Sequence, residues 1–520
     1  MFKNIRFIKN FLLFVIILIL GTNLLLDFSF IYDQFDKNSK KFITSYLVAH
    51  KNTISLQQEI KETKKERNKF ERQKIMFEQV YKDLKDDYIE IEYKSEILDK
   101  VFQQIDPYEI DLNIKKSNSN LVYRFNSEHS FSDNNINAKI FSPISNVLLY
   151  GIANKFPASG YIETYENKLI FISASGVLTY SNSKINNLNE YLQLKQIKTN
   201  IGKFIGEDQF KKSRIHNFDW LEGGWFPIKD INIFNDRVYV SYTREVEKDC
   251  WNTSLLHGKM NLKLIIFENL FTSEECVHFY NDIDKEFNAH QSGGRIINVD
   301  NDKLFFSTGD FRSRYRAQSK DSIFSKIIEI DKQSKKHKII SMGHRNPQGL
   351  FFDKKNNILL EAEHGPEGGD EINIIELNNK EIPNFGWAIS SYGEHYGGKN
   401  ASYNKKKYAK YPLHKSHLEY GFTEPFIYFN PSIGISQIIG LNDINKYVVA
   451  SMRDESLYFF DFDYGDKNLI FPNKVKNGNS ENIKIERVYI GERIRDMIYY
   501  DNKLYLYLED TASLAEVSFN

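Results

Sequence analysis

Residues 343–387 read GHRNPQGLFFDKKNNILLEAEHGPEGGDEINIIELNNKEIPNFGW, and the fold is decided by the segment at the centre of this stretch, KKNNILLEAEHG (354–365). In this segment, turn-forming residues precede a short apolar run (358–362), which favours a β-strand. Loops rich in glycine and proline, GHRNPQG (343–349) and EHGPEGGDE (363–371), lie on either side. Two ordinary surface turns are one interpretation of these loops. The order of loop, strand and loop is more typical of a rigid sheet that presents functional groups at its ends.

The same turn-and-strand unit recurs along the chain after residue 107. The other copies are YENKLIFIS (165–173), FNDRVYVSY (234–242), DNDKLFFSTGD (300–310), LNDINKYVVAS (441–451) and DNKLYLYLED (501–510). The turn residues at 167, 236, 302, 357, 445 and 502 are separated by 69, 66, 55, 88 and 57 positions. Six loosely spaced copies of a sheet unit predict an all-β domain, a six-bladed β-propeller over 107–520, whose blades bury their faces against their neighbours. A two-sheet sandwich is the alternative, and the length of the segment disfavours it.

Composition excludes several classes of protein. The chain of 520 residues has 69 basic and 69 acidic residues, and a formal charge of zero gives no support for a nucleic-acid partner. It contains no Rossmann glycine motif, P-loop, HExxH or GxSxG pattern, so a nucleotide-dependent enzyme of the usual kind is not expected. Cys250 and Cys276 show no metal-ligand spacing; they could pair in an oxidising compartment or remain two thiols in the core.

The N-terminus has the features of a membrane anchor. Lys3, Arg6 and Lys9 precede the apolar run FLLFVIILILGTNLLL (11–26), and apolar residues resume after Asp27. Positive charge before such a run keeps residues 1–10 in the cytoplasm and places the rest of the chain outside. Because we find no A-x-A-like cleavage site, an uncleaved transmembrane signal anchor over 11–32 is favoured over a cleaved signal peptide. The expected location is the inner (cytoplasmic) membrane, with a single span and the propeller facing the periplasm or the outside.

A charged segment over 40–104, free of proline and glycine, follows the anchor and predicts a long helical stalk. Residues from Leu56 to Ile91 recur at alternating steps of four and three, a pattern typical of a coiled coil, and the stalk is then a possible site of homo-oligomer formation. Thr63, Arg67 and Lys74 interrupt the apolar seam, so a single solvated helix is the other interpretation.

Charged residues occur at the places where a propeller forms its site. In such a fold the first strand of each blade begins near the central channel, and the loops at that end hold the functional groups. Arg493 and Arg495 are two positions apart, so in a strand both side chains would share a face. Arginine clusters suit planar polycarboxylates or phosphates, although a structural ion pair with a blade carboxylate is the alternative for each arginine. The candidate residues at these positions are His290, Asp310, Arg345, Asn346, Arg453, Arg493 and Arg495.

The loop after residue 363 offers a different kind of ligand. Gly365, Pro366, Gly368 and Gly369 leave few side chains there, so backbone carbonyl groups could face a ligand or a hard cation.

Taken together, the motifs HQSGGR (290–295), STGD (307–310), GHRNPQGL, EHGPEGGDEINII and NFGW (384–387) resemble the soluble glucose dehydrogenase and sorbosone dehydrogenase family. The resemblance covers about residue 223 to the C-terminus. It implies a six-bladed propeller that uses pyrroloquinoline quinone and calcium to oxidise aldose sugars.

The resemblance also implies a role for each candidate residue. His290 corresponds to the catalytic base and Asp310 to the carboxylate that orients it. Gly365 and Pro366 correspond to the residues whose carbonyl groups hold calcium. The positions that match cofactor-binding residues are Arg345, Asn346, Arg453, Arg493 and Arg495. Arg453 stands where a lysine is common, so a bidentate cation replaces a point charge.

The implied reaction is hydride transfer from a sugar or alcohol carbinol carbon to the quinone, with an electron acceptor that the sequence does not identify. His290 would act as general base, and calcium would polarise the accepting carbonyl. The segment after Asp310, Phe311 to Tyr315, and the segment 223–227 lack the glutamines that often contact sugar, so the substrate is not necessarily glucose. A non-catalytic propeller that binds a glycan or a protein at its channel face is the alternative function.

Overall fold

The computed structural model describes residues 121–131, 136–143, 159–174, 176–185, 188, 191–205, 227–441, 446–466 and 469–519. All of them belong to the second of two compact units, Glu90–Asn520. The predicted anchor (11–32) and stalk (40–104) lie outside the described residues and stay predictions. Among the residues that are described, no helix has both the length and the apolar character needed to cross a membrane.

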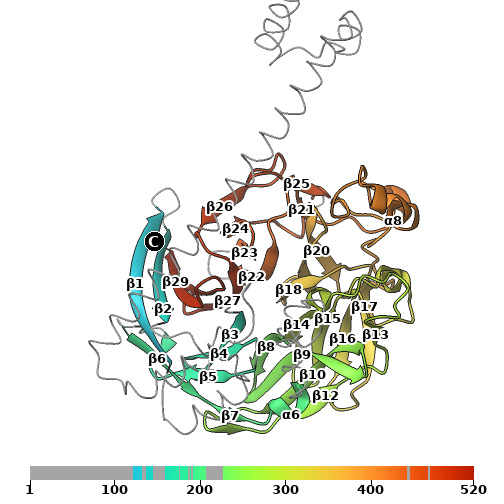
Figure 1. Ribbon diagram of the computed structural model, residues 1–520. Helices are drawn as coiled ribbons and strands as arrows, with labels where there is room; N and C mark the ends of the chain where they lie inside the picture. The colour runs from blue at the N-terminus through green and yellow to red at the C-terminus, as the bar shows by residue number, and fades with distance from the viewer. Residues whose placement is uncertain are drawn as a thin grey trace, which may run out of the picture. The chain divides into compact units, whose positions relative to one another are not determined.

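Six four-stranded blades stand in a ring, which confirms the predicted propeller (Figure 1). The first two blades are β3 (Gly160–Tyr165), β4 (Lys168–Ser173), β5 (Leu178–Ser181) and β6 (Tyr191–Gln196), then β8 (Ile228–Phe234), β9 (Arg237–Glu247), β10 (Cys250–Lys259) and β12 (Glu268–Phe271). The next two are β14 (Gly293–Asn298), β15 (Lys303–Thr308), β16 (Lys326–Asp331) and β17 (His337–Met342), then β18 (Pro347–Asp353), β19 (Ile358–Glu363), β20 (Asp370–Glu376) and β21 (Ile427–Phe429). The last two are β22 (Ile435–Leu441), β23 (Lys446–Ser451), β24 (Ser456–Phe460) and β26 (Ile485–Tyr489), then β27 (Ile494–Tyr500), β28 (Lys503–Leu508), β29 (Ser513–Phe519) and β2 (Ile136–Pro143).

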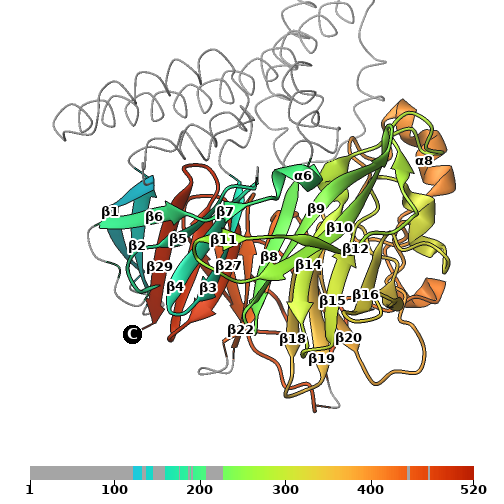
Figure 2. The same ribbon diagram turned by 90° about the horizontal axis from the view of Figure 1, so that it is seen from below.

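Short elements lie outside the four-strand pattern of the blades. They are the strands β7 (Lys198–Thr199), β11 (Leu264–Ile265), β13 (Val277–His278) and β25 (Asn473–Val475), the helices α6 (Gly202–Ile205) and α8 (Lys405–Lys410), and the 3-10 turns Ala289–Gln291, Arg314–Gln318, Ser402–Asn404 and Leu418–Tyr420. Helix α8 belongs to the long connection between β20 and β21, and Figure 2 shows it beside the ends of the blade strands.

The ring is closed by a strand from the N-terminal side of the propeller. Strand β2 pairs with β29 and so completes the blade formed by the C-terminal strands. Strand β1 (Leu121–Phe131) then pairs with both β2 and β6, which joins the last blade to the first at the outer edge. Closure of this kind removes unpaired strand edges from the junction.

Each repeat seen in the sequence is the hairpin between the first and second strands of a blade. Both central residues of the turns Glu166–Asn167, Asn235–Asp236 and Asp501–Asn502 have positive φ, and Asn357 has a φ of 52°. Asn and Asp tolerate this backbone better than most residues, which explains why these residues mark the repeats. The turn at residue 445 lies outside the described residues.

Apolar side chains fill the space between neighbouring blades. Buried clusters occur at the boundary of each neighbouring pair, including the pair that closes the ring. Between the third and fourth blades, for example, Phe305 and Ile327 belong to the same cluster as Leu350 and Leu359. The blades therefore bury their faces against one another, as the repeat pattern predicted.

A disulfide bond joins Cys250 to Cys276. Cys250 begins β10, and the short strand β13 that follows Cys276 pairs back onto this end of β10. The sequence left open whether the two cysteines pair, since their spacing of 26 residues says nothing about their distance in space.

Arg295 on β14 ties the inner strands together at the axis. Its Nη1 donates to Asp230 of β8 at 3.0 Å and to Asp496 of β27 at 2.8 Å, and its Nε donates to the carbonyl oxygen of Gln348 on β18. The guanidinium also lies over the ring of Tyr161 on β3, 5.2 Å from its centroid. The Arg295 side chain is only 3% exposed, so its charge depends on these partners.

We expect Arg295→Met to destabilise the propeller by about 3–5 kcal/mol, because it leaves two buried carboxylates without their cation. Urea unfolding of the variant and the wild type measures the difference. The matched control is Lys338→Met, because Lys338 is 62% exposed and its ion pair with Glu329 should contribute little. Equal stability of wild type and Arg295→Met would show that the inner strands do not depend on this contact.

Candidate active site

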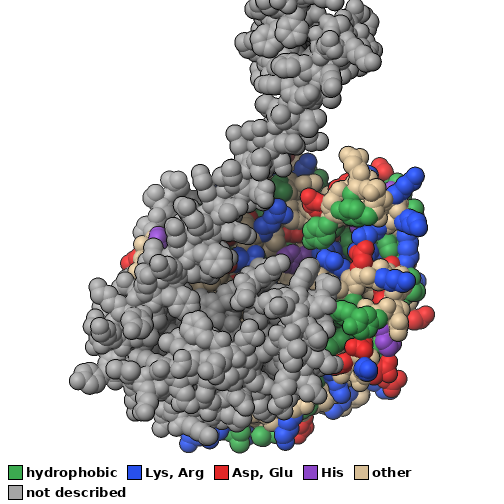
Figure 3. Space-filling view, in the orientation of Figure 1, with side chains coloured by type: hydrophobic (Ala, Val, Ile, Leu, Met, Phe, Trp, Pro, Cys, Tyr) green, Lys and Arg blue, Asp and Glu red, His purple; other side chains and the backbone are tan. Residues whose placement is uncertain are grey.

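Strand pairing brings the predicted site residues to one end of the ring. In each blade the start of the first strand pairs with the end of the second: Gly293 with Thr308, Pro347 with Glu363, and Ile494 with Leu508. Register shifts occur at this same end, and bulges of this kind often re-aim side chains beside a site. In the part of this face that Figure 3 draws in colour, Lys and Arg side chains and a histidine surround a hollow.

His290 lies in the 3-10 turn that leads into β14. Asn288 caps this turn, with its Oδ1 accepting a hydrogen bond from His290 N at 2.8 Å. Burial lowers the pKa of His290 well below its ordinary value, and the charges of Lys229, Arg495 and Arg312 add to this effect. The imidazole is therefore neutral at pH 7, which is the form that can accept a proton.

Asp310 is fully buried and holds the loops around His290 in place. Its Oδ2 accepts a hydrogen bond from Trp387 Nε1 at 2.8 Å, and its Oδ1 accepts one from Arg312 N at 2.7 Å. With the Gln291 amide turned so that its nitrogen faces Asp310, Gln291 donates to Asp310 Oδ1 at 3.0 Å. Among the described residues these bonds reach the neighbour of His290 and not the imidazole itself. Direct orientation of the ring by Asp310, which the resemblance implied, stays a prediction.

Arg493 and Arg495 share one buried carboxylate. Arg493 Nε donates to Glu509 Oε2 at 3.0 Å, and Arg495 Nε donates to Glu509 Oε1 at 2.8 Å. Burial raises the pKa of Glu509, but the charges of Arg495 and Arg493 outweigh burial and hold the pKa at about 2. The two guanidinium groups lie together, as their spacing predicted, but the three groups together carry a net charge of only about +1.

Arg345 is buried, and backbone carbonyl groups hold its guanidinium instead of a carboxylate. Its Nη1 donates to the carbonyl oxygens of His364 and Gly365, each at 2.8 Å, and its guanidinium lies 5.4 Å from the centroid of the Trp387 ring. It forms no ion pair with any carboxylate in the part of the chain that the structure describes. Neutral carbonyl groups thus position the Arg345 side chain, and its charge acts on the buried carboxyl group of Asp310.

Arg453 and Asn346 complete the predicted cofactor-binding set. Arg453 is exposed, and its guanidinium makes no hydrogen bond or ion pair with any residue that the structure describes. Asn346 is buried, and its Oδ1 accepts hydrogen bonds from Gly293 N at 3.2 Å and from Gln348 Nε2 at 3.1 Å. Asn346 therefore links the loops of the third and fourth blades, while Arg453 is available to a ligand.

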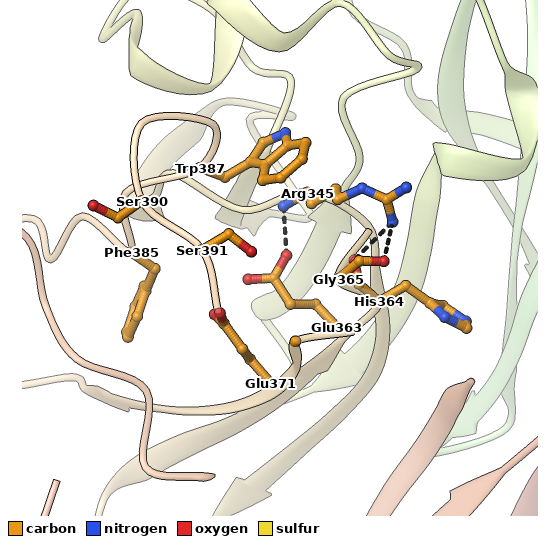
Figure 4. Close-up of a pocket in the computed structure, with 10 residues that line it drawn as sticks. Arg345, Glu363, His364, Gly365, Glu371, Phe385, Trp387, Ser390 and Ser391 are labelled. Atoms are coloured by element: carbon orange, nitrogen blue, oxygen red, sulfur yellow. Dashed lines mark hydrogen bonds between the residues drawn. The ribbon is translucent and has the colours of Figure 1, made fainter. Parts of the chain in front are cut away.

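A small pocket lies beside Gly365, lined by Arg345, Glu363, Glu371 and Trp387 among others (Figure 4). The Arg345 guanidinium and the His364 imidazole extend to the same side of this loop, away from the carboxylates of Glu363 and Glu371. Burial, with the nearby Glu363 carboxylate, raises the pKa of Glu371 well above its ordinary value.

The two carbonyl groups predicted to hold calcium already have donors. Gly365 O accepts from Arg345 Nη1 at 2.8 Å, and Pro366 O accepts from Ser432 Oγ at 3.3 Å. A carbonyl oxygen has two lone pairs, so each could still take a cation. A cation at Gly365 would, however, share its oxygen with a guanidinium.

Sequence reasoning missed several residues of this site. Glu509 follows a strand as an ordinary acidic residue, and Lys229 reads as one polar position in the alternating strand IKDINIF. His364 lies among Arg345, Arg495 and Arg493, and its pKa is about 3 because of burial and these charges. For Lys229 the sequence offered one signal. It is a lysine within a strand that continues into a buried face.

We expect Lys229→Met to stabilise the fold at acidic pH. Burial, and then the charge of Arg495, lower the pKa of Lys229 from its ordinary 10.5 to about 7. The unfolded chain therefore binds the extra proton between pH 7 and 10.5, so the destabilisation is full below pH 7 and disappears as pH rises through this window. Thermal unfolding at pH 6 and pH 10 should show the variant more stable at pH 6, with a smaller difference at pH 10. A variant less stable than wild type at pH 6 would contradict this.

The chain is similar to known proteins in sequence and in fold. Aldose sugar dehydrogenase YliI of Escherichia coli (strain K12) is 24% identical over 250 residues, which cover 44% of this chain and 62% of that protein. Quinoprotein glucose dehydrogenase B of Acinetobacter calcoaceticus is 42% identical over 67 residues, 13% of each chain. A crystal structure of a glucose dehydrogenase has the same fold, with a TM-score of 0.51 and 19% identity over 69% of this chain and 95% of that one. The family model described as glucose/sorbosone dehydrogenase matches residues 222–515, more than half of the chain. The chain belongs to the glucose/sorbosone dehydrogenase family.

Proposed function

We propose that the chain is a quinone-dependent dehydrogenase that oxidises a sugar or a related alcohol. The observation that carries the proposal is a neutral, half-buried His290 at the same end of the ring as Arg345 and Arg453, which form no ion pair with any carboxylate that the structure describes. A neutral imidazole supplies a base, and guanidinium groups without a paired carboxylate supply a binding site for an anionic cofactor. Family membership supports this proposal, as does a relative whose name is quinoprotein glucose dehydrogenase.

The cations fit pyrroloquinoline quinone, which carries three carboxylates. Arg345 and Arg453 form no ion pair with a described carboxylate, and Arg493 and Arg495 share the single carboxylate of Glu509. Planar guanidinium groups bind carboxylates through two parallel hydrogen bonds, which suits a flat, rigid ligand. These residues would hold the cofactor carboxylates, and Asn346 would keep the loop of Arg345 in place.

Calcium fits the same site only together with the cofactor. The carbonyl oxygens of Gly365 and Pro366 are hard ligands of the type that calcium prefers. The guanidinium of Arg345 on Gly365 O repels a cation, so calcium needs anionic ligands nearby to offset two positive charges. The carboxylates of pyrroloquinoline quinone would supply them.

The residues of the chain would then have different roles in the reaction. Arg345, Arg453, Arg493 and Arg495 would hold the quinone, which would supply the two-electron acceptor of the reaction, and calcium would supply polarisation of its carbonyl group. His290 takes the hydroxyl proton of the substrate while the carbinol C–H bond breaks and the C=O bond forms. Asp310, Gln291 and Trp387 keep the loops on either side of His290 at a fixed separation. A positioned base and a fixed acceptor are the two requirements of this reaction.

Two variants separate the proposed roles. His290→Gln should lower turnover by roughly 10²–10⁴-fold with little effect on quinone affinity, because the base contacts the substrate. Arg453→Met should weaken quinone binding by about 1.5–3 kcal/mol, with turnover recovering as quinone concentration rises, because it loses a charge-assisted contact. Absorbance titration with pyrroloquinoline quinone, with and without calcium, and dye-linked oxidation of a sugar panel measure both effects, with Lys338→Met as control.

The same titration can refute the proposal. If the wild-type protein does not bind pyrroloquinoline quinone in the presence of calcium, the dehydrogenase assignment is wrong. A propeller that binds a glycan or a protein at its channel face would then be the better account.

We also propose that the propeller is anchored to the inner membrane and faces outward. The basic residues Lys3, Arg6 and Lys9 before the apolar run support this orientation. The disulfide between Cys250 and Cys276 supports an oxidising compartment, where such bonds persist.

Protease added to intact spheroplasts should cut the propeller, and the protein should remain in the membrane fraction after a salt wash. A periplasmic protein serves as the positive control and a cytoplasmic protein as the negative one. A propeller that is protected while the periplasmic control is degraded would contradict the outward orientation.

A further inference from the structure

Two buried glutamates on β19 form a charged cluster behind the loops of the site. Glu361 and Glu363 are two positions apart on the strand, so their side chains share a face, and they are 0% and 4% exposed. In the part of the chain that the structure describes, the group that pairs with both carboxylates is the buried imidazole of His344. The buried carboxylates at the axis and beside Arg493 each face an arginine instead. Burial of two carboxylates calls for more positive charge than a histidine supplies.

One nitrogen of His344 faces both carboxylates. Its Nδ1 is 3.5 Å from Glu361 Oε2 and 3.3 Å from Glu363 Oε1, and one atom from each of the three residues lies within 4.8 Å of the others. An imidazolium that pairs with a carboxylate stands about 2.7–2.9 Å from its oxygen. Atoms that bind one tetrahedral ion at about 2.0–2.2 Å stand about 3.3–3.6 Å apart. The separations in the cluster match the second arrangement.

Glu361 also has an oxygen without a partner. Its Oε1 is buried, and it accepts no hydrogen bond from any residue within the described ranges. An unpaired oxygen on a buried carboxylate is unfavourable. Because both oxygens of a carboxylate can bind the same cation, an ion held by Glu361 through Oε1 and Oε2 would remove this cost and gain a fourth ligand atom.

Hydrogen bonds orient each of the three residues, as is usual for metal ligands. His344 Nε2 lies 2.7 Å from Ser341 Oγ on β17, and when Nε2 donates to this oxygen, Nδ1 keeps a lone pair that faces the carboxylates. Glu363 Oε2 accepts a hydrogen bond from the backbone N–H that follows His344. Asn373 on β20 donates from Nδ2 to Glu361 Oε2 at 2.9 Å and to Glu363 Oε1 at 3.1 Å. A lone pair and two carboxylates that face one another leave a place for a cation.

We propose that His344, Glu361 and Glu363 bind one structural zinc ion. An imidazole nitrogen and carboxylate oxygens in a tetrahedral set are typical of zinc, whereas calcium and magnesium prefer oxygen ligands alone. The charge of +2 balances the two carboxylates. Because all three residues are buried, the site is closed, which is the form of a structural zinc site. The proposal goes beyond the dehydrogenase function and does not depend on it.

The zinc ion would fasten together the two loops that carry candidate cofactor-binding residues. His344 directly precedes Arg345, and Glu363 directly precedes His364 and Gly365. The carbonyl groups of His364 and Gly365 hold the Arg345 guanidinium, each at 2.8 Å. An ion that joins His344 to Glu363 would fix the ends of both loops, and so the position of Arg345.

Metal analysis of the purified full-length protein tests the proposal. Wild type dialysed against metal-free buffer should contain about one zinc ion per chain by inductively coupled plasma mass spectrometry. Glu361→Gln keeps the shape of the side chain and removes its charge, so the zinc content should fall by at least about tenfold. The matched control is Glu371→Gln, because Glu371 is a buried glutamate of the same blade that lies outside the cluster. This control should keep the zinc content of wild type.

Two measurements on the wild type keep the test valid if Glu361→Gln does not fold. Wild type stripped of metal by EDTA in mild urea, and then freed of both, should melt several degrees lower at pH 7. Added zinc should restore the melting temperature, and added calcium should not. Cobalt(II) in place of zinc should give the strong visible absorption of a tetrahedral site.

Each contrary result has a clear meaning. Wild type that contains no zinc, with a melting temperature that neither EDTA nor zinc changes, overturns the proposal, and protons then neutralise the cluster. Zinc that is lost in Glu371→Gln and kept in Glu361→Gln belongs to the pocket beside Gly365, which also overturns it. Calcium that is bound in place of zinc and lost in Glu361→Gln overturns the choice of ion. Titration with the quinone remains a separate test of the dehydrogenase function.

Discussion

The contact of Arg295 with Asp230 and Asp496 is the constraint on which the rest of this propeller depends. It joins strands of the second, third and sixth blades, and the two carboxylates are 65 and 201 residues away in sequence. A guanidinium buried to this degree needs its full set of partners, so the inner strands have little freedom to slide or rotate about the axis. Because functional loops begin and end on these strands, the axis also sets the geometry of the site.

The distribution of carboxylates explains why one end of the channel is cationic. At the axis, Asp230 and Asp496 share a single arginine, and burial raises the pKa of Asp230 to about 7. At the mouth, among the residues that the structure describes, Glu509 forms ion pairs with both Arg493 and Arg495. Two guanidinium groups therefore share one carboxylate there, and their hydrogen bonds hold them in place. Fixed charges of this kind stabilise an anion without the reorganisation that water would need.

The sequence predicted the site residues that belong to contiguous motifs. Arg345, Asn346 and Gly365 occur in loops whose glycine and proline content marks them as special, and the structure puts those loops at one end of the ring. Glu509 and Lys229 could not be found in this way. Lys229 looks like an ordinary polar position in an alternating strand and Glu509 like an ordinary acidic residue after one, and the importance of each lies in what it contacts. The partners of Asp310, which include Trp387 Nε1, illustrate the same limit, because a motif shows proximity along the chain and not which atoms meet.

The sequence by itself determined the hairpins, the number of blades and the positions of the candidate loops. These features depend on turn chemistry and on alternation within a strand, which act over a few residues. Only the tertiary structure decided that β2 closes the last blade, that Cys250 pairs with Cys276, and which cations at the mouth form ion pairs with carboxylates. Neutralisation and burial depend on groups brought together from distant parts of the chain, so no local pattern can encode them.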